Sequence, residues 1–139
     1  MIVLDTNVVS EFIKPRPDPR VLVWVDSRLD SDVATTAITL GELGYGAARM
    51  PTGQRKRQLE AEIAGIADDF RGRIEPFDAA AAEHYGSIRA ERERLGRPIS
   101  MPDTQIASIC RRLSATLATR NTKDFEHTGI DVVDPWQAS

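Results

Sequence analysis

The chain has 139 residues, a length that suits one domain over residues 1–139 with a substantial buried core. Its formal net charge of −3 gives no sign of a basic nucleic-acid-binding surface, and no apolar run approaches the roughly 20 residues that span a bilayer. A single cysteine, Cys110, excludes an internal disulfide and is expected to be a small buried residue, so we expect a cytoplasmic protein.

The first eleven residues predict a strand that passes directly into a helix. Ile2, Val3 and Leu4 form a short apolar run, and Val8 and Val9 continue at helical spacing. A carboxylate, Asp5, stands at the junction. In an open α/β sheet, ligands bind beyond the carboxyl ends of the strands, whereas an aspartate before a helix also serves as an ordinary cap.

Proline and glycine breaks divide the first half of the chain into further elements. In order, we expect a proline-rich turn at 14–19, a helix at 19–29, a strand at 32–37, a helix at 38–50 and a helix at 54–70.

The second half continues the alternation of strands with helices. In order, we expect a strand at 73–77, a helix at 79–95, a helix at 100–113, a strand at 115–119, a loop with one helical turn at 120–125 and an edge strand at 130–133. Such alternation predicts a parallel sheet with helices on both faces.

Three acids share one local setting, the start of a helix. Besides Asp5, Glu42 follows Thr39 by three residues, and Asp103 follows Ser100 by three. This spacing matches the capping box, in which the acid reaches back to the cap residue. Capping alone explains each acid at least as well as catalysis does.

The surroundings of two acids point beyond capping. Asp103 shares a helix face with Ala107 and Cys110, so its carboxylate is expected to be partly desolvated, and a bound cation would offset that cost. Near Glu42 stand three glycines, at 41, 44 and 46, each costing roughly 0.5–1 kcal/mol relative to alanine in a helix. Their presence suggests either a group approaching the backbone or tight helix packing.

Convergence of these carboxylates at one sheet edge would create a site for a hard cation. Oxygen ligands select Mg²⁺ or Mn²⁺. Such ions activate water and neutralise phosphate during hydrolysis of a phosphodiester, and they let an acidic protein bind an anionic polymer.

Four segments resemble, in their order along the chain, the motifs of PIN-domain nucleases, and most closely the VapC toxins with their FitB-like group. They are residues 4–7, 39–43, 102–107 and 118–125. The resemblance implies a three-layer α/β/α sandwich around a mostly parallel sheet of four to five strands. It also implies an endoribonuclease that depends on Mg²⁺ or Mn²⁺ and hydrolyses RNA phosphodiester bonds.

By the same resemblance, Asp5, Glu42 and Asp103 match the acids that hold the metal, with Asp5 and Asp103 as the first candidates for direct ligands. The chain departs from the pattern at Asn121, where many PIN domains carry a fourth aspartate. Asp124 is the alternative fourth acid.

Two threonines are further candidate site residues. Thr6 and Thr119 resemble family residues that hydrogen-bond the acids or position water, although threonines are also ordinary at strand ends.

The resemblance further implies a homodimer and a cognate VapB-type antitoxin, which blocks the site with a C-terminal segment and contacts operator DNA. An alternative from a different class is a nucleic-acid-binding regulator that acts with such a partner at DNA and has little catalysis. The missing fourth acid and the basic run at 55–57 motivate it. A phosphoryl-transfer domain is disfavoured because Asn7 occupies the position where the phosphatase pattern has a second aspartate.

Overall fold

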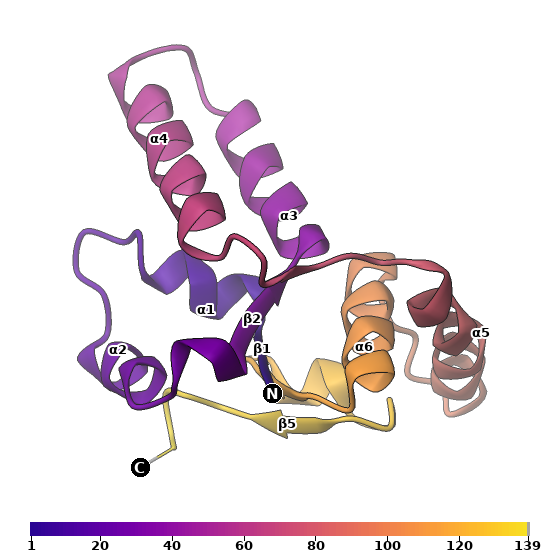
Figure 1. Ribbon diagram of the computed structural model, residues 1–139. Coiled ribbons are helices and arrows are strands. Elements are labelled where there is room, and N and C mark those ends of the chain that lie inside the picture. Colours follow the sequence, from indigo (N-terminus) through magenta and orange to yellow (C-terminus); the bar gives the residue numbers. More distant parts are fainter. Residues whose placement is uncertain (139) are drawn as a thin grey trace.

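The structure is a computed structural model, and it describes residues 1–138 (Figure 1). The five strands are β1 (Ile2–Leu4), β2 (Val33–Thr36), β3 (Ile74–Glu75), β4 (Thr116–Ala118) and β5 (Asp131–Val133). The α-helices within these described residues are α1 (Thr6–Glu11), α2 (Pro19–Asp26), α3 (Ala37–Ala48), α4 (Gln54–Asp69), α5 (Ala79–Arg94) and α6 (Met101–Leu113). Two 3-10 helices are η1 (Asp30–Asp32) and η2 (Thr122–Phe125).

The strands form one sheet in the order β3-β2-β1-β4-β5, with every neighbouring pair parallel. The first strand of the chain therefore lies at the centre, between β2 and β4, and β5 lies at an edge as predicted. Because all strands point the same way, the residues that follow them gather at one edge of the sheet. The predicted α/β fold with a parallel sheet is confirmed.

Two hydrophobic clusters lie on opposite faces of the sheet. Leu4 and Ala118 point into a cluster with α1 to α4, whereas Val3 and Leu117 point into a cluster with α5 and α6. This alternation follows from the two-residue period of a strand, and it explains why the central strand β1 is apolar throughout. Figure 1 shows α5 and α6 together on one side, while α3 and α4 form a hairpin that projects from the body.

Within residues 1–138, no helix combines the length and the apolar character needed to cross a membrane.

Two predicted boundaries are wrong. The helix at 19–29 ends at Asp26, because the chain then turns into η1, and Leu29 is left exposed. The strand at 73–77 pairs only over Ile74–Glu75, since Pro76, the next residue, has no N–H to donate.

The start of α3 also differs from the prediction. Thr36 caps the helix by accepting a hydrogen bond from the Thr39 backbone N–H at 3.1 Å. The capping box proposed for Thr39 and Glu42 is therefore wrong, because Glu42 already lies in the second turn. Its carboxylate is free to serve another purpose.

The α3 glycines are not explained by tight packing within the chain. A Cβ placed at Gly41, Gly44 or Gly46 would meet no atom within 4 Å. Of the two explanations offered by the sequence, tight packing against another helix of the described chain is therefore wrong.

Candidate active site

Four carboxylates gather at the carboxyl edge of the sheet. Asp5 directly follows the central strand β1, Glu42 comes from α3, Asp103 from the first turn of α6, and Asp124 from η2. Each lies within Coulombic range of others in the group: Glu42 and Asp124 act on Asp5, and all three act on Asp103. The sheet topology thus brings together acids that are far apart in sequence.

Asp5 is the most enclosed of the four, with 5% of its surface exposed. Its Oδ1 accepts the Thr6 backbone N–H at 2.8 Å, and its Oδ2 accepts the Thr119 hydroxyl at 2.7 Å. Burial raises the pKa of Asp5, and the nearby carboxylates of Glu42 and Asp124 raise it further against these hydrogen bonds. Asp5 is therefore both the cap of α1 and a member of the acidic group.

Glu42 is held by the residue that follows Asp5. The Thr6 hydroxyl donates to Glu42 Oε1 at 2.7 Å and lies 3.2 Å from the hydroxyl of Thr39. A short hydroxyl network therefore ties the start of α1 to α3 and fixes the direction of the Glu42 carboxylate.

Asp103 occupies the first turn of α6, where Ser100 caps the helix by accepting the Asp103 N–H at 3.2 Å. Burial raises the pKa of Asp103 to about 6, with a further contribution from the negative charge of Asp5. The half-buried carboxylate is thus short of positive partners, as the sequence predicted from its helix face.

The two candidates for the fourth acidic position have different environments. Asn121 uses its backbone N–H to bond Thr119 Oγ1 at 3.1 Å, and its side chain is exposed. Asp124 carries a negative charge that acts on both Asp5 and Asp103.

Sequence reasoning missed two residues that shape the site. Asn7 donates to Thr119 Oγ1 at 3.2 Å and accepts the Arg120 N–H at 3.2 Å, so it joins α1 to the end of β4. Arg92 on α5 is buried and donates to the backbone carbonyls of Asp124 and Glu126. Asn7 stood inside a recognised motif, but nothing in the arginine-rich helix marked Arg92.

The donor set suits a hard divalent cation that is bound from one side. In the described chain, no three acidic, histidine or cysteine side chains are arranged to enclose a metal ion. The acids therefore lie near one another without forming a closed cage. Mg²⁺ commonly uses one or two carboxylates and takes its remaining ligands from water and substrate phosphates, so an open group of oxygen ligands fits it.

The fold and the site together define a class of protein: a parallel α/β domain with acidic side chains gathered at the carboxyl edge of its sheet. The profile of the PIN domain family matches residues 2–131, and the chain is a member of that family.

Several known proteins are similar to this chain over almost its whole length. VapC ribonuclease Y4jK of Sinorhizobium fredii is 38% identical over 138 residues, with 99% of each chain covered. Toxin FitB of Neisseria gonorrhoeae is 40% identical over 137 residues, covering 98% of this chain and 99% of the relative. A chain in the solved structure of FitAB bound to an IR36 DNA fragment has a TM-score of 0.92 at 38% identity, covering 100% of this chain and 98% of that one.

Proposed function

We propose that the chain is the toxin of a type II toxin–antitoxin pair and acts as an endoribonuclease that hydrolyses RNA phosphodiester bonds. The gathering of four carboxylates at the carboxyl edge of the sheet carries the proposal. The names of two relatives, a VapC ribonuclease and the toxin FitB, support it.

The proposed cofactor is Mg²⁺ or Mn²⁺, held by Asp5 and Asp103 directly, with Glu42 as a third ligand and Asp124 as the fourth acid. When bound, the ion would neutralise the phosphate and supply an activated water. Thr119 and Thr6 keep the carboxylates of Asp5 and Glu42 oriented through their hydroxyl hydrogen bonds.

We also propose the partners. A VapB-type antitoxin covers the site and carries the pair to operator DNA, and the toxin itself forms a homodimer. The similarity to a chain in the FitAB–DNA structure supports an assembly of this kind.

The test is cleavage of single-stranded RNA by the purified chain with Mg²⁺ or Mn²⁺, and again with EDTA. Asp5→Asn keeps the size of the side chain but removes the charge, and we expect cleavage to fall by about 100-fold or more, beyond the loss typical of groups that only surround a ligand. EDTA is expected to abolish cleavage, and added Mn²⁺ to restore it.

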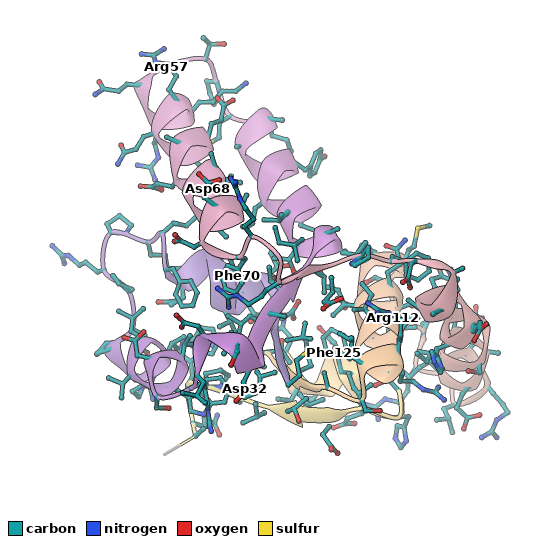
Figure 2. All side chains as sticks on the ribbon, in the orientation of Figure 1. Asp32, Arg57, Asp68, Phe70, Arg112 and Phe125 are labelled. Atoms are coloured by element: carbon teal, nitrogen blue, oxygen red, sulfur yellow. The ribbon has the colours of Figure 1, made fainter. Side chains whose placement is uncertain are left out.

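Asp32→Asn is the matched control. Asp32 is exposed and precedes β2, so it lies at the end of the sheet opposite the acids (Figure 2). We expect this variant to retain full activity. Cleavage by Asp5→Asn at the wild-type rate would contradict the site. If the wild type cleaves no RNA but binds operator DNA together with a partner, the alternative of a nucleic-acid-binding regulator would be favoured.

A further inference from the structure

A second feature lies beside the acidic group: a groove of about 310 Å³ formed by the loop after β4 and the C-terminal segment. Its lining includes Arg120, Asn121 and Lys123 from the loop and Asp134 from beyond β5. Asp124, one of the four acids, lines it as well, so the groove adjoins the candidate active site. Its walls are mainly polar.

Arg120 is held in place from two sides. Its backbone N–H donates to Asn7 Oδ1 at 3.2 Å, and its guanidinium carbon lies 4.9 Å from the centroid of the Trp136 ring. Trp136 is 5% exposed, so the ring is a fixed support. A guanidinium stacked on an aromatic face keeps its N–H groups at the edge, where they can bind a phosphate in a bidentate manner.

In the described part of the chain, the two cations of the groove form no ion pair at contact distance, although the charge of Arg120 also acts on Asp18. Arg120 and Lys123 are exposed, and neither takes part in an ion pair within residues 1–138. Several other arginines do have carboxylate partners, for example Arg97 with Glu126 at 2.8 Å. Cations without an internal partner are available to an anion from outside.

The carboxylates of the groove have other partners. Asp134 accepts the Trp136 N–H at 2.9 Å and lies in the field of Arg20, while Asp124 belongs to the acidic group. The two cations and two carboxylates of the lining balance in formal charge, so an anion would be bound through the exposed side chains of Arg120 and Lys123 and not through a net charge of the groove.

We propose that this groove binds the phosphates of single-stranded RNA next to the bond that is cut, with Arg120 and Lys123 as the residues that contact them. The inference rests on the proposed ribonuclease function. A bound metal ion would offset the repulsion between the four carboxylates and the phosphate that it contacts, and cations beside the group would hold the flanking phosphates.

The test compares the wild type with an Arg120→Gln/Lys123→Gln variant in steady-state cleavage of a short single-stranded RNA. We expect KM to rise by about 10-fold while kcat changes by less than about twofold, because binding is lost and not the chemistry. The slope of log KM against log salt should fall by about 1.4, since each phosphate contact on a single strand contributes about 0.7.

Arg28→Gln/Arg71→Gln is the matched control, because it removes two exposed positive charges that lie shortly before β2 and β3, at the edge of the sheet opposite the acids. We expect its KM to stay within about twofold of the wild type. An equal rise in KM in both double variants, or an unchanged KM and salt slope in the groove variant, would overturn the proposal.

Two further measurements keep the test decisive. Lys123→Gln alone does not touch Trp136, so its expected KM increase cannot come from loss of that packing. Anisotropy of labelled RNA in EDTA measures binding without cleavage. If the wild type binds RNA through Arg120 and Lys123 but does not cleave it, the groove proposal is supported and the proposed ribonuclease function is contradicted. If cleavage occurs but the groove variant binds like the wild type, only the groove proposal fails.

Discussion

At the scale of single residues, two of the four acids, Asp5 and Asp103, are placed where their ionised forms are electrostatically unfavourable. Burial and mutual repulsion raise the pKa values of Asp5 and Asp103, so each carboxylate is less stable ionised in the folded chain than in water. Such sites are common where binding a cation, rather than stability, determines the residue.

This penalty predicts a pH dependence of stability. The pKa of Asp103 is raised from 3.8 to about 6, so the folded state binds a proton more tightly than the unfolded state, and stability is gained as pH falls from 8 through 6. Asp103→Asn removes the ionised form. In EDTA at pH 8 we expect it to raise the free energy of unfolding by about 1–2 kcal/mol, allowing for solvent screening.

Urea unfolding of both proteins at pH 8 and pH 4.5 measures this effect. The advantage of Asp103→Asn should shrink toward zero at the lower pH, where the wild-type carboxyl is protonated in the folded state. A difference between the two proteins that is the same at both pH values would show that the charge of Asp103 is not its source.

The sequence singled out three acids that the structure brings together, and it did so for a limited reason. Asp5, Glu42 and Asp103 each stand in a short local pattern, which can be recognised in the sequence without knowledge of the fold. No local pattern chooses between Asn121 and Asp124 for the fourth position, and the choice stays a prediction. The structure adds only that the negative charge of Asp124 lies near enough to act on Asp5.

At the scale of elements, α5 does more than cover the sheet. Arg92 is 5% exposed, and its guanidinium donates to the carbonyls of Arg97, Asp124 and Glu126 at 2.7, 2.6 and 3.1 Å. The buried charge is therefore met entirely by backbone oxygens. It ties α5 to η2, the turn that carries the Asp124 carboxylate.

Loss of this tie should be costly. Arg92→Met removes the donors of three part-buried hydrogen bonds and the interior charge that makes them, and we expect the free energy of unfolding to fall by roughly 2–4 kcal/mol. Arg94→Met, which breaks only the exposed ion pair with Glu91, should cost less than about 1 kcal/mol. Denaturant unfolding compares the two, and equal losses would contradict the role given to Arg92.

Element prediction succeeded where periodicity and breaks agreed. The strand over residues 2–4, the single turn after β4 and the edge strand β5 were expected from local patterns, and the structure contains them. It failed at α2 and at the start of α3. There, the end of a helix was set by a 3-10 turn and its start by the side chain of Thr36, features that hydrophobic periodicity does not report.

At the scale of the whole molecule, the α3–α4 hairpin projects from the body of the fold (Figure 1). An open groove of about 400 Å³ runs between its helices, and Leu40, Gly44 and Ile63 are among the residues that line it. The free space around Gly44 means that the glycine has no steric reason within the described chain.

Gly44→Ala should therefore stabilise the chain. A Cβ at this position meets nothing within 4 Å, so the expected gain in the free energy of unfolding is about 0.5–1 kcal/mol. Gly72→Ala is the contrasting variant, because its φ of +81° is strained for any residue with a Cβ, and it should destabilise. Thermal unfolding compares them, and a loss of stability in Gly44→Ala would contradict the open space.

The central position of β1 has a consequence for synthesis. Its partner β4 lies at residues 116–118, and the hydroxyl that holds Asp5 belongs to Thr119. In a nascent chain, β1 and Asp5 lack these partners until most of the message has been translated, because a contact between residues so distant in sequence forms only after both have been synthesised. Nuclease competence would then begin only near the end of translation, and a prematurely terminated product would be harmless.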